Sequence, residues 1–154
     1  MPLLRRIRIY HATLATLTVL AFVTGEAGLI HEWLGYGVAA VIVARLIWAL
    51  SGVRQLGLMR FYPQFRGLRL DNAFTHPAVS RTILLSIAVC LIGVTVTGLA
   101  LDDGRESVLE EIHEAMANIL IWLVGAHVAY LLLFKRPLAR FMLFFDPPPS
   151  SPGA

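Results

Sequence analysis

Charged residues are scarce in this chain, and their scarcity limits the class of protein it can be. Of the 154 residues, 15% are charged and 57% are hydrophobic, whereas a soluble domain carries roughly 25% charged residues. The length allows one domain. A soluble domain of this size has too small an interior to bury so much apolar sequence, so the composition excludes an ordinary soluble protein.

Cysteine is almost absent as well. Cys90 is the single cysteine, so the chain cannot form an internal disulfide, and it contains no C-x-x-C-H motif. The missing motif excludes covalently attached c-type haem. We interpret Cys90 as a small residue packed within or against a helix. The apolar runs also lack the alternation of apolar and polar residues that is typical of a membrane β-barrel.

Long apolar runs are what the sequence has in abundance. Four of them cover residues 7–25, 33–50, 82–101 and 112–134, and a transmembrane helix needs about 20 such residues. Helices are the natural spanning form because they satisfy their own backbone hydrogen bonds within lipid. We therefore predict an all-α membrane protein built as a bundle of four transmembrane helices.

The connections between the apolar runs alternate in charge. The basic connections hold Arg5, Arg6 and Arg8, then Arg54, Arg60, Arg66, Arg69 and Arg81, and finally Lys135, Arg136 and Arg140. The acidic connections hold Glu26 and Glu32, then Asp102, Asp103, Glu106, Glu110, Glu111 and Glu114. Because lysine and arginine mark the cytoplasmic side, we predict that both termini are cytoplasmic and that the acidic connections lie outside.

The charge pattern also suggests how the rest of the chain is organised. We expect one four-helix domain over residues 1–145 and a proline-rich, disordered tail over residues 146–154. The long connection over residues 51–81 interleaves aromatic residues with arginines, which favours a segment that lies on the inner membrane surface.

Four of the five histidines fall in or at the ends of the predicted spans, where ionisable groups are costly and usually mark a functional site. His11 and His127 lie towards the cytoplasmic ends of their helices, whereas His31 and His113 lie at the outer ends. We call His31 and His113 the outer pair, and His11 and His127 the inner pair. His76 has no partner at its level and is interpreted as a surface residue.

The interval between His113 and His127 places both side chains on nearly the same face of the last helix. The two are fourteen residues apart, which corresponds to about 21 Å and falls roughly 40° short of four full turns. The first two helices offer partners at matching depths. This arrangement predicts two b-type haems, with His11 and His127 on the inner iron and His31 and His113 on the outer iron.

Arg45 is the one charged residue inside the second apolar run. It follows His31 by fourteen residues, so it shares the inner level and could pair with a propionate of the inner haem; the alternative is an arginine that snorkels to the inner surface. Gly35, Gly98 and Gly125 would let a flat haem approach the backbone. Plain helix packing is the alternative role for these glycines.

Several short motifs, in order along the chain, resemble the bacterial cytochrome b561 superfamily, which includes the b-type cytochrome subunits of nickel–iron hydrogenases. The likeness extends from about residue 5 to residue 140. The matching stretches are Arg8-Ile-Tyr-His11, Thr24-Gly-Glu26, His31-Glu-Trp-Leu-Gly-Tyr-Gly37, Ala44-Arg-Leu-Ile-Trp48, Thr75-His-Pro-Ala78, Thr97-Gly98, and Ile112-His-Glu-Ala-Met-Ala-Asn118 with His127.

The resemblance implies a four-helix bundle with two haems b that moves electrons between a quinone pool and another redox protein. The family's ligands match His11, His31, His113 and His127. The resemblance also implies a bacterial inner (cytoplasmic) membrane, with lipid and quinone as partners. A quinone is a candidate second cofactor and a homodimer is a candidate assembly, whereas no nucleic acid partner is expected.

We therefore expect an electron carrier or an oxidoreductase subunit rather than a stand-alone catalyst. Two imidazoles on each iron leave no open position for oxygen. The acidic outer face favours a basic redox partner such as a c-type cytochrome and would repel superoxide. The alternatives are a haem-bearing membrane anchor of a larger, hydrogenase-like oxidoreductase and a superoxide-oxidising quinone reductase. A haem-free transporter is disfavoured, because no acidic residue lies deep within a run.

Overall fold

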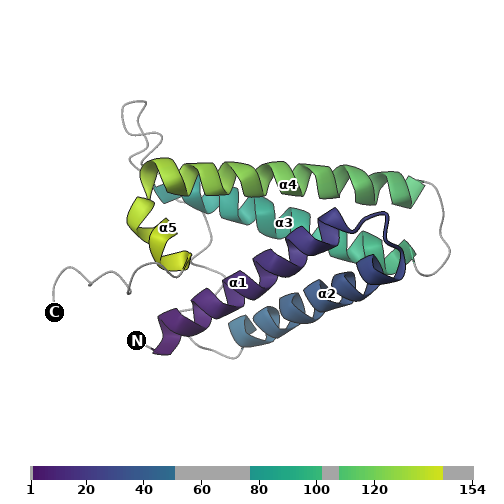
Figure 1. Ribbon diagram of the computed structural model, residues 1–154, viewed down its shortest axis with the longest axis horizontal. Coiled ribbons are helices and arrows are strands. Elements are labelled where there is room, and N and C mark those ends of the chain that lie inside the picture. The colour runs from purple at the N-terminus through teal and green to yellow at the C-terminus, as the bar shows by residue number, and fades with distance from the viewer. Residues whose placement is uncertain (1, 51–76, 102–107, 144–154) are drawn as a thin grey trace.

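Helices make up nearly all of the chain that the computed structural model describes, namely residues 2–50, 77–101 and 108–143. Four of these helices are long: α1 (Pro2–Val23), α2 (Leu29–Leu50), α3 (Pro77–Leu101) and α4 (Val108–Phe134). A short helix, α5 (Arg136–Met142), follows α4 (Figure 1). Because no strand occurs within these ranges, the prediction of an all-α protein is confirmed for them.

The long helices begin earlier than the apolar runs that predicted them. We expected α2, α3 and α4 to begin at residues 33, 82 and 112, but they begin at Leu29, Pro77 and Val108. The difference arises because apolar sequence tracks the lipid, whereas helical hydrogen bonding continues through polar turns. The first turn of α4 contains Glu110 and Glu111, which are favourable beside the positive end of the helix dipole.

Three of the described helices are long and apolar enough to cross a membrane. These candidate spans are Leu29–Trp48 in α2, Ala78–Leu101 in α3 and Val108–Phe134 in α4. The fourth predicted span corresponds to α1, which lies outside this set because arginines, a histidine and several threonines reduce its mean hydropathy. The protein is therefore a multi-pass membrane protein with at least three apolar helices of spanning length.

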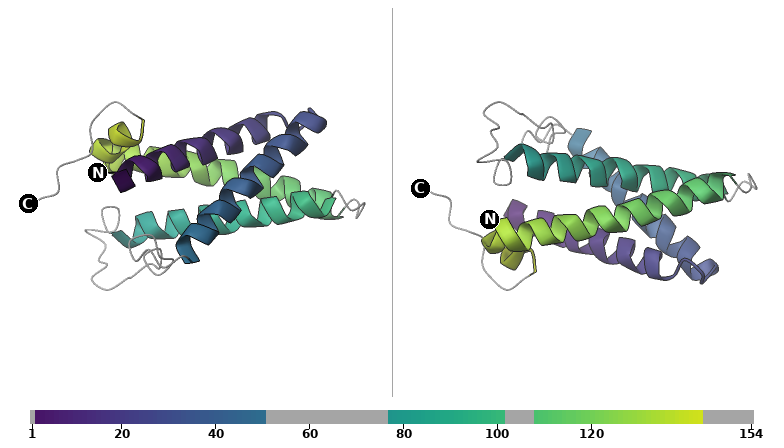
Figure 2. Two further views of the ribbon diagram at one scale, coloured as in Figure 1. Left: turned by 90° about the horizontal axis from the view of Figure 1, so that it is seen from below. Right: turned by 90° about the horizontal axis from the view of Figure 1, so that it is seen from above.

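The four long helices form two antiparallel pairs. The most extensive contacts join α3 to α4 and α1 to α2, and α2 also contacts α3. In Figure 2, α2 runs obliquely across α3. The turn between α1 and α2, the end of α3 and the start of α4 all lie at one end of the bundle (Figure 1).

A tight turn joins α1 to α2. The Thr24 hydroxyl donates a hydrogen bond to the Leu20 carbonyl at 2.7 Å, and the Ala27 amide donates to the Thr24 carbonyl at 2.8 Å. Gly28 has a positive φ of 51°, a conformation that costs glycine little because it has no Cβ. This turn sends α2 back along α1, where the Tyr10 hydroxyl donates to the Val41 carbonyl at 3.0 Å.

The opposite end of the bundle brings the two ends of the described chain together. Arg8 of α1 donates from Nη1 to the Phe141 carbonyl of α5 at 3.2 Å. Its guanidinium carbon also lies 4.8 Å from the centre of the Phe141 ring, within the range of a cation–π interaction. Phe141 and Ala139 are buried, so α5 is folded back onto the bundle.

The buried core is small and lies midway along the helices. Val38, Cys90, Leu91 and Leu120 form one cluster, with more exposed apolar side chains packed around it. Leu120 is seven residues from His113 and seven from His127, so the cluster separates the two levels at which histidines occur. Many large apolar side chains point outwards, including Trp122 at 79% exposure, as expected for a surface that faces lipid.

Some predictions concern parts of the chain outside the described residues. They include His76, residues 51–76 of the long basic connection, residues 102–107 of the acidic connection and the tail over residues 146–154. The division into a 1–145 domain and a tail therefore stays a prediction.

Candidate haem-binding site

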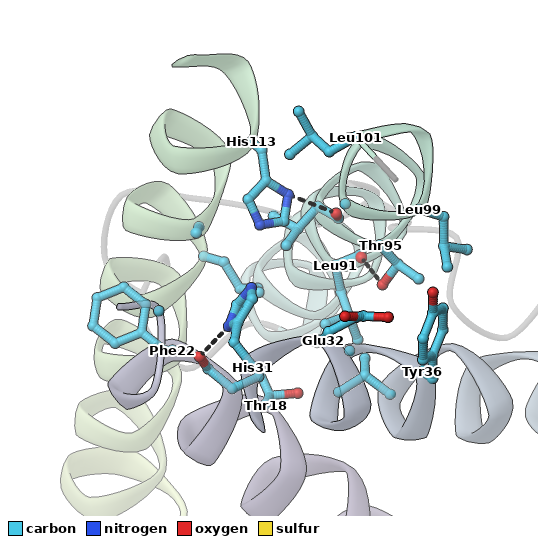
Figure 3. Close-up of a pocket in the computed structure, with 18 of the residues that line it drawn as sticks. Thr18, Phe22, His31, Glu32, Tyr36, Leu91, Thr95, Leu99, Leu101 and His113 are labelled. Carbon is cyan, nitrogen blue, oxygen red and sulfur yellow. Dashed lines mark hydrogen bonds between the residues drawn. The ribbon is translucent and has the colours of Figure 1, made fainter. Parts of the chain in front are cut away.

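The outer pair brings two imidazoles together from different helices. His31 lies in the first turns of α2 and His113 in the first turns of α4. Their ring centres are 6.0 Å apart and the ring planes make an angle of 84°. Figure 3 shows both rings projecting into the same cavity from opposite sides.

The main chain fixes which nitrogen of each outer imidazole carries the proton. Nδ1 of His31 lies 2.8 Å from the Ala21 carbonyl oxygen, and Nδ1 of His113 lies 3.0 Å from that of Val94. A carbonyl oxygen can only accept a hydrogen bond, so in both rings Nδ1 is the protonated donor. The Nε2 lone pair of each ring is therefore free to bind a metal.

A cavity of about 370 Å³ adjoins the outer pair. Its walls come from all four long helices, and Val38, Leu91 and Leu120 of the buried core line it. The remaining lining residues include Thr18, Ala21, Phe22, Gly25, Glu32, Gly35, Tyr36, Val94, Thr95, Gly98, Glu110 and Ala117. The cavity is mostly apolar with a few polar groups, which is the usual character of a cofactor site.

Two glycines beside the outer pair have different roles. A Cβ added at Gly98 would lie 3.0 Å from Cε1 of His113, so Gly98 allows the ring to pack directly against α3. A Cβ added at Gly35 would meet nothing within 4 Å, and Gly35 lines the cavity. The sequence predicted that both would make room for haem; the structure places Gly98 against the imidazole and Gly35 at the open space.

The inner pair also brings its two rings together. The ring centres of His11 in α1 and His127 in α4 are 6.5 Å apart, and the ring planes make an angle of 48°. Nδ1 of His127 is buried without a hydrogen-bond partner among the described residues. A Cβ added at Gly125 would meet nothing within 4 Å. Gly125 is exposed and lies two residues before His127, so its open space is on another face of α4. Within the described residues, Nδ1 of His127 lacks the carbonyl contacts that hold the outer rings.

Tyr10 relates the position of Arg45 to that of the inner pair. The Tyr10 hydroxyl contacts the Val41 carbonyl one turn before Arg45 in α2, and Arg45 is close enough to Tyr10 to act on it electrostatically. Tyr10 directly precedes His11 in the sequence. The structure thus puts Arg45 at the level of the inner pair, while its role towards a propionate stays a prediction.

The spacing of both pairs fits bis-imidazole binding of a metal. A metal ion lies about 2 Å from each imidazole nitrogen, and each ring centre is about 1 Å further away, so two rings on one metal have centres roughly 6 Å apart. The observed separations are 6.0 Å and 6.5 Å. The residues present therefore fit an iron held between two histidines at each level. No group of three or more histidine, cysteine or acidic side chains that could hold a metal ion occurs in the described ranges.

Sequence reasoning missed the groups that orient the imidazoles. These groups are the carbonyls of Ala21 and Val94 and the hydroxyl of Thr97, whose oxygen lies 3.1 Å from Nδ1 of His113. The Thr97-Gly98 motif was the available signal for one of these contacts, that of the Thr97 hydroxyl. Main-chain carbonyls leave no signal in a sequence, because every residue has one.

Comparison with known proteins supplies one match. The family model described as prokaryotic cytochrome b561 matches residues 5–144 of the chain. No curated protein and no solved structure matches the chain.

Proposed function

Because the chain belongs to the prokaryotic cytochrome b561 family, which implies a membrane protein that transfers electrons through haem b, we propose that it carries two haems b. One haem is held by the outer pair and one by the inner pair. Electrons pass between the quinone pool and a redox partner protein. The protein acts as a carrier rather than as a stand-alone catalyst.

The observation that supports this proposal best is the state of the outer imidazoles. His31 and His113 each use Nδ1 to bind a carbonyl of the protein and keep Nε2 for a ligand. Their ring centres are 6.0 Å apart, as two ligands of one metal require. A pair of histidines that served only helix packing would not need both features.

The chain's own residues hold and orient the cofactor. Haem b, when bound, supplies a reversible one-electron couple between ferric and ferrous iron. The two histidines at each level would hold the iron between them, so small molecules such as oxygen would bind poorly. Arg45 would neutralise a propionate at the inner level. The apolar core at Val38 and Leu120 keeps the two levels apart.

The membrane arrangement follows from the packing of α1. This helix has 22 residues, about 33 Å of helix, and it runs antiparallel to α2, which has a span of its own. We infer that α1 is the fourth span. The start of α1 and helix α5 lie at the same end of the bundle (Figure 1), and both carry basic residues. Because lysine and arginine mark the cytoplasmic side, we infer that both termini are cytoplasmic and that the bundle lies in a bacterial inner membrane.

The partner proposal rests on charge at the opposite end. Near the start of α2 and α4, the chain exposes Glu26, Glu32, Glu110, Glu111 and Glu114. A basic redox protein such as a c-type cytochrome would be attracted to this face. A quinone dissolved in the lipid bilayer would exchange electrons with the protein.

Counting haems in histidine variants tests the proposal. Reduced-minus-oxidised spectra with pyridine haemochrome quantification should give two haems b per purified chain. His31→Ala or His113→Ala should leave one haem, as should His11→Ala or His127→Ala. Combining His31→Ala with His127→Ala should leave none, because each substitution removes one ligand from a different pair.

His76→Ala is the matched control and should retain both haems, because His76 lies in neither pair. A single haem in the wild-type protein would show that one pair is misassigned. A wild-type protein that contains no haem after expression with haem supplied would overturn the function.

A further inference from the structure

Thr97 of α3 lies between the helix backbone and the His113 ring. Its hydroxyl donates to the Gly93 carbonyl at 2.9 Å, with the Val94 carbonyl at 3.0 Å. Since its proton is used in this way, a lone pair of the same oxygen faces Nδ1 of His113 at 3.1 Å. The Nδ1 proton is thus shared between two acceptors, the Thr97 hydroxyl and the Val94 carbonyl.

Two acceptors restrict the ring more than one does. With a single acceptor an imidazole can still turn about the bond that joins it to Cβ, whereas two acceptors on different atoms of α3 define the plane of the ring. Gly98 also helps to position the ring. A Cβ added at Gly98 would lie only 3.0 Å from Cε1 of His113, so the absence of a Cβ lets the ring pack against α3. His113 is held on α3 by Thr97, Val94 and Gly98, although it belongs to α4.

The restricted ring stands almost perpendicular to its partner. The planes of His31 and His113 make an angle of 84°, against 48° for the inner pair. Within the described residues, Nδ1 of His127 has no hydrogen bond at all. The near-perpendicular arrangement therefore occurs in the outer pair, in which both rings are hydrogen-bonded at Nδ1.

We propose that Thr97 is a positioning residue that holds the His113 imidazole perpendicular to that of His31 and strengthens it as a ligand. The inference rests on the proposed function, since it concerns the outer haem. A hydrogen bond from Nδ1 increases the basicity of the coordinating nitrogen. A more basic ligand stabilises ferric over ferrous iron, so Thr97 lowers the reduction potential of the outer haem.

The relative orientation of two axial imidazoles can be measured directly. In a low-spin ferric haem, the electron paramagnetic resonance signal becomes more anisotropic, with its first feature at lower field, as the imidazole planes approach perpendicular. The wild-type outer haem should give such a low-field signal. The inner haem should give a less anisotropic one.

The test compares Thr97→Val, Thr97→Ser and Thr82→Val in the full chain. Thr97→Val keeps the shape and removes the hydroxyl. Thr97→Ser keeps the hydroxyl. Thr82→Val is the matched control, because it makes the same substitution on α3 at an exposed position outside the lining of the cavity. Resonance spectra, midpoint potentials and haem counts are recorded for each variant.

We expect Thr97→Val to move the low-field signal to higher field and to raise the potential of one haem only. Thr97→Ser and Thr82→Val should stay close to wild type. If Thr97→Val loses the outer haem altogether, retention of that haem by Thr97→Ser supports the proposal.

Two results would overturn the inference: an unchanged signal and potential in Thr97→Val, or equal changes in the Val and Ser variants. The haem count distinguishes failure of the positioning role from failure of the proposed function. Two haems with no response to Thr97→Val contradict the positioning role alone, whereas a wild-type protein without haem contradicts the function itself.

Discussion

Single residues of the outer pair depend on atoms supplied by other helices. His31 in α2 is oriented by a carbonyl of α1, and His113 in α4 by a carbonyl of α3. Each ligand is therefore correctly placed only when two helices are correctly packed. Because the acceptors belong to the main chain, side-chain substitutions at Ala21 and Val94 leave them in place.

Gly98→Ala should disturb the outer site more than its small size suggests. The added Cβ would lie 3.0 Å from Cε1 and 3.4 Å from Nδ1 of His113, closer than ordinary contacts allow, and the ring cannot retreat without losing its two acceptors. We expect the outer haem to be lost from at least half of the purified chains, as measured by pyridine haemochrome.

Gly37→Ala is the control for that substitution. Its Cβ would meet only the Leu17 side chain, at 3.6 Å, which is an ordinary van der Waals distance. The control should keep two haems per chain. Full haem content in Gly98→Ala would show that the His113 ring has room to move.

At this scale, the sequence predicted which histidines come together in pairs but not the groups that orient them. The interval between His113 and His127 depends on the geometry of one helix, so it can be calculated from residue numbers. The contact between Thr97 and His113 depends on how α3 and α4 pack together, and nothing in the spacing along one helix determines that. Gly98 was identified as important, but its contact was not.

At the scale of secondary structure, Arg8 of α1 holds α5 against the bundle. Arg8 binds both the carbonyl and the ring of Phe141, and Phe141 is 3% exposed. The helices that carry the inner histidines, α1 and α4, are thereby joined at one end of the bundle through α5. Ala139 and Phe141 of α5 are buried, so this basic helix is packed against the rest of the protein.

Arg8→Ala should therefore weaken the docking of α5. Loss of a charged hydrogen bond and a cation–π contact costs about 1–2 kcal/mol. We expect a lower midpoint of thermal unfolding in detergent and faster trypsin cleavage after Arg140, which is exposed. Arg6→Ala is the control, since Arg6 is exposed on the same helix. Equal effects of the two substitutions would indicate that charge alone, rather than docking, is responsible.

Helix ends were the part of the fold that hydropathy predicted least well. Apolar composition locates a span, but α2 and α4 continue for about one further turn into acidic sequence. In α1, polar residues such as Arg8 and His11 lower the mean hydropathy, so this helix is outside the set of candidate spans. Arg8 contacts α5 and the His11 ring lies beside that of His127. The existence of all four long helices could nevertheless be predicted.

For the whole molecule, the proposed function implies that charge makes the two haem levels differ. Glu32 and Glu110 line the outer cavity, and negative charge stabilises ferric iron. Arg45 lies at the inner level and favours ferrous iron. Both outer histidines also donate hydrogen bonds from Nδ1, which has the same effect on potential as the carboxylates.

The outer haem should therefore be harder to reduce than the inner one. Potentiometric titration of His11→Ala, which retains the outer haem, should give a lower midpoint potential than titration of His31→Ala, which retains the inner haem. The two variants serve as each other's control. The opposite order would contradict this assignment of electrostatic roles.

Association with a basic c-type cytochrome should weaken as salt rises. The screening length falls from about 30 Å at 0.01 M to about 3 Å at 1 M, so steering by the acidic face should be lost over that range. Stopped-flow measurement of electron transfer should show a steep decline in the second-order rate constant. Glu111→Gln with Glu114→Gln should flatten this dependence, whereas a rate that does not respond to salt would exclude steering.

The small apolar core has a consequence for the energetics of the membrane. Val38, Cys90, Leu91 and Leu120 form an apolar layer between the two histidine levels. An electron can tunnel through such a layer, whereas a proton needs a chain of hydrogen bonds. In the proposed function, each transfer between levels moves charge without a compensating ion, so it works with or against the membrane voltage, by up to about 2.3 kcal/mol per 100 mV for a full crossing.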